Sequence, residues 1–129
     1  MAPEETYLPL VTQRLVWVAV DGELIGFASS EAFEAELHLW ELAVRHEAQG
    51  RGAGRALLAA VVAEARARQL PAVTLTTFRD IPWNAPFYAR CGFVELSERD
   101  FSPVLEMVRE REAEIGLDVA RRCAMRLTF

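Results

Sequence analysis

The segment Gln49-Gly-Arg-Gly-Ala-Gly54 decides the fold of this chain. Before it, residues 37–44 are apolar nearly throughout, which is typical of a buried strand. After it, apolar residues between 52 and 69 recur at helical spacing and predict an amphipathic helix. A glycine-rich turn that opens a helix suits a bound phosphate, because the first N–H groups of the helix are free and its dipole is positive there. The segment therefore predicts a phosphate cradle.

Two familiar nucleotide motifs do not fit this turn. A P-loop ends in Gly-Lys-Ser/Thr, and all 14 basic residues of the chain are arginines. The glycines at 50, 52 and 54 also have the wrong spacing for the dinucleotide fingerprint. Arg51 and Arg55 place full positive charges at the rim, and arginine pairs well with phosphate. The alternative that the glycines only make a tight turn stays open.

The rest of the chain alternates strands with helices. Asp21-Gly22 predicts a hairpin turn between the first two strands. We expect strands at 14–20, 24–29, 37–44, 73–77, 93–96 and 122–129, and helices at 52–69, at 84–90 and from Asp100 or Ser102 to about Ile115. This order predicts an α/β (α+β) fold in which a mixed sheet is flanked by helices, and the length of 129 residues predicts one domain over 1–129.

Composition narrows the class of protein. A net charge of −5 argues against a nucleic-acid surface, and no apolar run approaches the ~20 residues that cross a bilayer. Two cysteines, Cys91 and Cys123, form neither a metal site nor a disulfide framework by themselves. The first residues carry acids and no basic region, unlike a signal peptide. We expect a cytoplasmic protein with no metal, no membrane and no nucleic-acid partner.

Two motifs together resemble the GNAT (GCN5-related N-acetyltransferase) family. Gln49-x-x-Gly52-x-Gly54 is similar to its Gln/Arg-x-x-Gly-x-Gly/Ala signature, and Asn84-Ala-Pro-Phe-Tyr-Ala-Arg-Cys-Gly-Phe93 to its second signature. The resemblance covers roughly 17–93. It implies a GNAT-like, mostly antiparallel central sheet flanked by helices, and acetyl-CoA as the co-substrate. Only about 14 residues precede the first strand, so we expect a shortened N-terminal region in place of the family's usual strand and two helices.

The resemblance also implies roles for particular residues. The CoA pyrophosphate would be bound by backbone amides of Gln49, Gly50, Arg51, Gly52, Ala53, Gly54 and Arg55. The pantetheine arm would pair with the backbone of Leu42, Ala43 and Val44, with the Leu42 N–H polarising the thioester carbonyl. Tyr88 would protonate the departing thiolate, with a core aromatic as the alternative. Asn84 either binds pantetheine or caps the helix.

The resemblance also implies a Glu or His on the strand at 37–44 as general base, often acting through water, and three residues are candidates. His38 lies four residues before Leu42, which in a regular strand places both on one face, and histidine has a suitable ordinary pKa. A hydrogen-bonded, partly buried histidine is the alternative reading of His38. Glu41 projects to the opposite face unless a bulge turns it, and Asp80 is a weaker third candidate.

The function that we expect is transfer of an acetyl group from acetyl-CoA to a primary amine, by direct attack in a ternary complex. A catalytically silent CoA-binding or regulatory module is the alternative, and an interaction domain without a ligand is the third. The sequence does not identify the acceptor amine. A homodimer is plausible because a small open sheet has an edge to cover.

Overall fold

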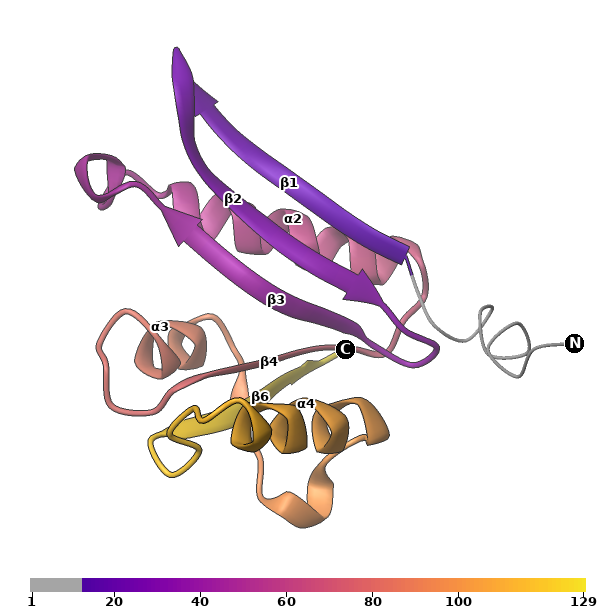
Figure 1. The fold of residues 1–129 in the computed structure, drawn as a ribbon. Helices are drawn as coiled ribbons and strands as arrows, with labels where there is room; N and C mark the ends of the chain where they lie inside the picture. The colour runs from indigo at the N-terminus through magenta and orange to yellow at the C-terminus, as the bar shows by residue number, and fades with distance from the viewer. Residues whose placement is uncertain (1–12) are drawn as a thin grey trace, which may run out of the picture. The chain divides into compact units, whose positions relative to one another are not determined.

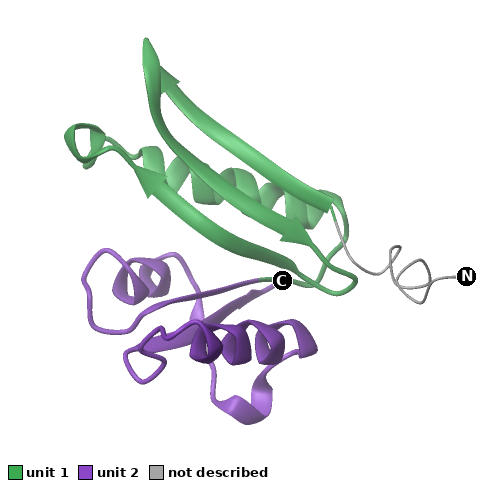
Figure 2. Ribbon diagram, in the orientation of Figure 1, with its two compact units in different colours: residues 1–73 green, residues 74–129 purple. Residues whose placement is uncertain are grey.

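The computed structural model describes residues 13–129, and residues within this range form two compact units. Within the described range the first unit comprises residues 13–73 and the second comprises residues 74–129 (Figure 2). The expected shortening of the N-terminal region concerns residues that lie outside the described range. The single domain over 1–129 stays a prediction.

The first unit is a three-stranded antiparallel sheet with one long helix (Figure 1). Its strands are β1 (Gln13–Asp21), β2 (Glu23–Ala32) and β3 (Leu37–Val44). A 3-10 turn, η1 (His46–Ala48), leads from β3 to helix α2 (Ala53–Ala67). The predicted hairpin turn is confirmed, with Gly22 at φ 78° between β1 and β2.

Helix α2 packs against all three strands of this sheet. Its apolar stripe, Leu57, Leu58, Val61 and Ala65, is buried as the helical spacing predicted. The buried strand residues Ala28, Leu37 and Leu39 occupy one face of the sheet, because their cross-strand register places them together. On the other face, three β-branched residues of β1 are exposed, namely Val16, Val18 and Val20.

The second unit contains the remaining strands and helices. These are β4 (Ala72–Phe78), which the unit boundary crosses, α3 (Ala85–Arg90), β5 (Val94–Glu95), η2 (Glu98–Asp100), α4 (Pro103–Glu114) and β6 (Arg122–Thr128). Strand β6 lies between β4 and β5 and is antiparallel to β5. Asp100 and Ser102 were the two predicted N-cap residues of α4. Ser102 is the N-cap, since its hydroxyl accepts a hydrogen bond from the Leu105 N–H at 3.2 Å.

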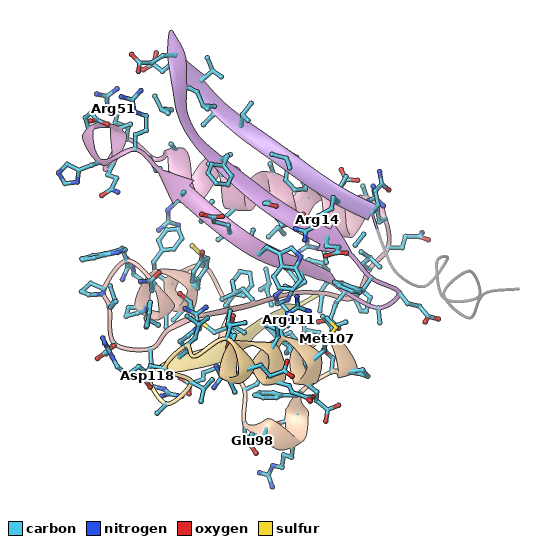
Figure 3. All side chains as sticks on the ribbon, viewed as in Figure 1. Arg14, Arg51, Glu98, Met107, Arg111 and Asp118 are labelled. Carbon is cyan, nitrogen blue, oxygen red and sulfur yellow. The ribbon has the colours of Figure 1, made fainter. Side chains whose placement is uncertain are left out.

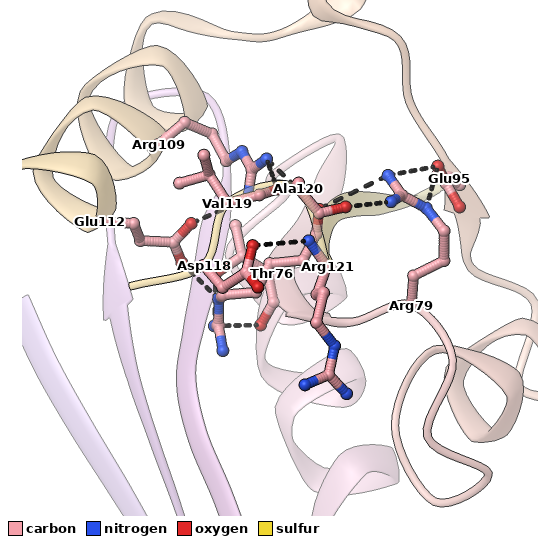
Figure 4. A network of polar contacts seen from close by, with 10 residues as sticks. Thr76, Arg79, Glu95, Arg109, Glu112, Asp118, Val119, Ala120 and Arg121 are labelled. Atoms are coloured by element: carbon pink, nitrogen blue, oxygen red, sulfur yellow. Dashed lines mark hydrogen bonds and ion pairs between the residues drawn. The ribbon is translucent and has the colours of Figure 1, made fainter. Parts of the chain in front are cut away.

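A polar network ties α4 to the strands of the second unit (Figure 4). The side chain of Glu112 is only 8% exposed and accepts hydrogen bonds from Thr76 Oγ1 at 2.5 Å, Arg109 Nη1 at 2.9 Å and Arg122 Nε at 3.2 Å. Arg109 also donates to the Val119 carbonyl at 2.8 Å. A buried carboxylate is stable only when its oxygens are paired in this way.

Neither a membrane-spanning helix nor a cluster of metal ligands occurs among residues 13–129. No helix in the range 13–129 is long and apolar enough to cross a membrane. No three His, Cys, Asp or Glu side chains in that range are grouped as metal ligands.

Candidate functional site

The start of helix α2 presents open backbone N–H groups. Gly52 is the N-cap residue at φ 84°, so no side chain caps the helix, and the first turn contains no acid. The first N–H groups of an α-helix have no partner within the helix. Residues 49–52 and Arg55 are exposed. An anion can therefore approach these N–H groups from solvent.

The three glycines of the loop are not equivalent. Gly50 and Gly52 have φ of 85° and 84°, a conformation that favours glycine whatever the ligand. Gly54 lies within α2 without a positive φ, and a Cβ there would meet Val44 Cγ2 at an ordinary 3.7 Å. A tight turn therefore explains Gly50 and Gly52 but not Gly54.

The loop is fastened to the end of β3. Gln49 Nε2 donates to the Val44 carbonyl at 3.1 Å, and the Arg45 N–H donates to the Ile25 carbonyl at 2.7 Å. At Gly26 a Cβ would lie 2.7 Å from the Ala43 carbonyl oxygen, so β2 and β3 approach too closely there for a side chain. The first unit thus brings the predicted residues 42–44 and 49–55 together.

Gly26 is a site-forming residue that sequence reasoning missed. A glycine inside a strand marks a close backbone approach or a bulge. Gly26 stands inside the strand predicted at 24–29, and this position could have indicated the close approach from the sequence.

Carboxylates surround the arginines of the loop. Arg51 Nη1 lies 3.5 Å from Asp21 Oδ2, and Nη2 donates to the Glu47 carbonyl at 3.3 Å (Figure 3 labels Arg51). Arg45 forms ion pairs with Glu23 and with Glu47, and Glu23 is the first cause of the raised pKa of Arg45. Arg51 was predicted to place a full charge at the rim, and in the structure that charge lies against Asp21 at the end of β1.

Arg55 differs from these two arginines. Its side chain is exposed, and no ion pair to it is found among residues 13–129. Of the two rim arginines that were predicted, Arg55 is the one whose charge is unopposed.

A bulge at Trp40 changes the faces of β3. Ser29 pairs with Glu41 and Ser30 with Leu39, so Trp40 is the extra residue. Beyond it, His38 lies opposite Glu31, on the face that Glu41 occupies. The expectation that His38 shares the face of Leu42 is therefore wrong. The bulge places the two base candidates together on one face of β3.

His38 is deeply buried and neutral. It is 1% exposed, and burial lowers its pKa from 6.5 to about 4. Its ring packs edge-on against Trp40, with centroids 4.5 Å apart. The Trp40 indole N–H donates to Glu31 at 2.8 Å. Glu41, in contrast, is exposed. His38 and Glu41 therefore lie on the same face of β3, but His38 is buried whereas Glu41 is exposed to solvent.

The remaining candidates lie in the second unit. Tyr88, on α3, is 7% exposed and packs edge-on against Phe87 and Phe93 at centroid distances of 5.2 and 5.7 Å. Burial, and then Cys91, raise its pKa to about 12, so the phenol is protonated at pH 7. Tyr88 therefore packs as a core aromatic, and its role toward the departing thiolate stays a prediction.

Asn84 and Asp80 flank this helix on its N-terminal side. Asn84 is the N-cap residue of α3, but its side chain makes no capping hydrogen bond, and only its carbonyl accepts from the Tyr88 N–H at 3.0 Å. Asp80 is exposed and lies 3.5 Å from Arg121.

Comparison with known families decides the identity of the chain. The family model described as "Acetyltransferase (GNAT) domain" matches residues 12–95. The chain belongs to the GNAT acetyltransferase family. The family prediction from the two motifs is confirmed, and so is the class of enzyme, an acyltransferase of the GNAT type.

Solved structures of GNAT proteins share the fold. An acetyltransferase from Bacillus cereus is 18% identical with TM-score 0.67, over 92% of this chain and 74% of that one. PaiA N-acetyltransferase from Thermoplasma acidophilum, in complex with coenzyme A, is 18% identical with TM-score 0.65, over 90% and 61%. N-acetylglutamate synthase from Neisseria gonorrhoeae, with coenzyme A and N-acetyl-glutamate, is 21% identical with TM-score 0.70, over 99% and 28%. The predicted GNAT fold class is confirmed.

Proposed function

We propose that this GNAT protein is an acetyl-CoA-dependent N-acetyltransferase that acts on a primary amine by direct attack in a ternary complex. The observation that carries the proposal is the start of α2, where Gly52 caps the helix without a side chain and residues 49–52 are exposed. Two of the similar structures contain coenzyme A, which supports the same ligand here. In this proposal residues 49–55 bind the pyrophosphate, and Arg55 adds an unopposed charge.

The reaction follows from the chemistry of a thioester. The neutral amine nitrogen attacks the carbonyl carbon, the C–S bond breaks, and the amide and the CoA thiolate form. We assign the backbone of residues 42–44 to the pantetheine arm and the Leu42 N–H to the developing oxyanion. The proton lost by the amine balances the charge of the thiolate.

Tyr88 is our candidate partner of the sulfur. With a pKa of about 12 its phenol is a weaker acid than an ordinary thiol at ~8.5, so complete proton transfer to the thiolate is uphill. We therefore assign Tyr88 a hydrogen bond to the sulfur as the C–S bond breaks. Tyr88→Phe should lower kcat and leave the Kd for acetyl-CoA nearly unchanged. Equal kcat would exclude this role, and Phe87→Leu is the packing control.

His38, Glu41 and water remain candidates for the base. A pKa of about 4 keeps His38 unprotonated at pH 7 but makes it a weak base, whereas Glu41 is exposed to an acceptor arriving from solvent. His38→Gln and Glu41→Gln should be compared at saturating acetyl-CoA. The variant that loses kcat identifies the base, and two unchanged values point to water. Asn84 is a further candidate for binding the pantetheine arm, and Asp80 is the third candidate for the base. Variants at these two positions test both roles in the same assay.

The direct test is release of free CoA thiol from acetyl-CoA across a panel of primary amines. Binding is measured separately, since a ligand that binds only the folded state raises the melting temperature. We expect acetyl-CoA to raise the melting temperature and at least one amine to release thiol. Without binding, the cradle assignment fails.

A CoA-binding module without turnover is the second candidate function. The pKa values of His38 and Tyr88 favour it, because both groups are poorly matched to proton transfer at pH 7. Binding of acetyl-CoA with no thiol release from any amine of the panel would select this function.

We further propose a cytoplasmic protein that needs no metal and binds neither nucleic acid nor membrane. The acidic net charge supports this assignment. We also propose a homodimer, supported by the exposed apolar residues of β1, namely Val16, Val18 and Val20. Light scattering that gives the monomer mass would refute the dimer.

A further inference from the structure

The turn between β1 and β2 delivers two carboxylates to the proposed CoA cradle. Asp21 Oδ2 lies 3.5 Å from Arg51 Nη1, and Glu23 forms an ion pair with Arg45. The turn and the cradle loop are distant in sequence, and they meet at one end of the first unit's sheet because Gly26 pairs with Val44.

These ion pairs contribute little to the fold. The turn is formed by Gly22 at φ 78° and by the β1–β2 ladder, while the backbone bond from Arg45 to Ile25 fastens the end of β3. The side chains of Asp21 and Glu23 are 71% and 67% exposed. Exposed pairs of this kind contribute little stability. Their larger effect is to reduce the positive charge of Arg51 and Arg45 that is available to an anionic ligand.

We propose that Asp21 and Glu23 compete with the phosphates of acyl-CoA for Arg51 and Arg45, and so limit how tightly the protein holds the co-substrate. This inference rests on the proposed cradle. A phosphate oxygen accepts strongly from a guanidinium, and to gain that bond it must displace the carboxylate or share the guanidinium with it. The competition weakens binding of acyl-CoA and of the CoA product alike, which speeds product release.

The test is calorimetric titration of the full chain with CoA. Asp21→Asn is expected to lower the Kd by about two- to five-fold, the range of one exposed ion pair, and the double variant with Glu23→Gln to lower it further. Glu34→Gln is the matched control. It also removes one exposed negative charge, but Glu34 lies in the β2–β3 connection, at the opposite end of β2.

Two further measurements separate competition from a structural effect. The gain in affinity should shrink as salt is raised towards 1 M, because exposed charges are then screened. In an Arg51→Gln background, Asp21→Asn should have much less effect, since the arginine for which it competes is gone.

The outcomes are distinguishable. If the wild type binds CoA but Asp21→Asn binds equally or more weakly, or if Glu34→Gln gives the same gain, the competition is overturned while the cradle stands. If neither the wild type nor any variant binds CoA, the cradle is refuted and this inference with it.

Discussion

Arginine–carboxylate pairs occur both at the cradle loop of the first unit and in the polar network of the second, in opposite surroundings. Asp21 and Arg51 have side chains 71% and 58% exposed, whereas those of Glu112 and Arg109 are 8% and 19% exposed. Water screens the first pair, so a ligand can exchange with it. The second is desolvated, so removing one partner leaves a buried charge. Burial, more than residue type, decides whether such a pair serves binding or folding.

The largest effect is expected from breaking the buried network. Glu112→Ala leaves Arg109 and Arg122 without their carboxylate and should lower the free energy of unfolding by about 3–5 kcal/mol. Urea denaturation measures this change. Glu110→Ala, an exposed glutamate on the same helix, should stay within about 0.5 kcal/mol. A similar loss in both variants would show that the network has no special role.

The next effect concerns the buried histidine of the first unit. Between pH 6.5 and about 4 the unfolded chain binds a proton at His38 and the folded chain does not, so stability falls as the pH is lowered through this window. The contribution is on the order of 3 kcal/mol, present in full above pH 6.5 and lost near pH 4. Urea midpoints across this range should fall less steeply in His38→Gln than in the wild type.

His46, the only other histidine, is exposed and provides the control. His46→Gln should retain the wild-type pH dependence, and it leaves a single histidine signal whose NMR titration reports His38 directly. A midpoint near 6.5 in that titration would contradict the buried, neutral state.

A smaller effect is expected where β2 approaches β3. Gly26→Ala places a Cβ 2.7 Å from the Ala43 carbonyl, and relieving this overlap should lower stability by about 1–3 kcal/mol. Because the shifted backbone belongs to residues 42–44, the Kd for acetyl-CoA should rise as well. Thermal denaturation and calorimetry measure the two effects. If Gly26→Ala kept the wild-type stability, β2 and β3 would be able to move apart at this point without a cost in free energy.

The smallest effect distinguishes two glycines of the cradle. Gly52→Ala forces a positive φ on alanine and should destabilise the fold by about 1–2 kcal/mol. Gly54→Ala should leave stability unchanged or raise it by up to about 1 kcal/mol, and yet weaken CoA binding. Melting temperatures with and without CoA report both quantities. Unchanged CoA affinity in Gly54→Ala would mean that this glycine does not serve the ligand.

Much of the fold was predictable because its signals are local. Asp21-Gly22 marked the hairpin, and the apolar period from Leu57 to Ala65 marked α2. The 3-10 turns η1 and η2 were missed, since a single turn has no period to detect. Strand β5 is shorter than predicted because only Val94 and Glu95 pair with β6.

The site was less predictable because its geometry depends on pairing between strands. The bulge at Trp40 appears only in the register of β3 against β2, and regular alternation put His38 on the wrong face. Likewise, no local pattern indicates that Asp21 contacts Arg51. The loop itself was predictable because its three glycines lie within a single short stretch of sequence, at positions 50, 52 and 54.

Arginine is the cation in the ion pairs of Asp21, Glu23 and Glu112, and lysine is absent from the sequence. A guanidinium stays protonated at pH 7 and has no free electron pair to attack a thioester. A lysine in the place of Arg51 or Arg55 would be a point charge with an amine that can lose its proton, whereas the guanidinium offers a planar set of donors. If the loop binds CoA as proposed, its arginine rim keeps a positive charge for the phosphates over the whole pH range in which the protein is folded.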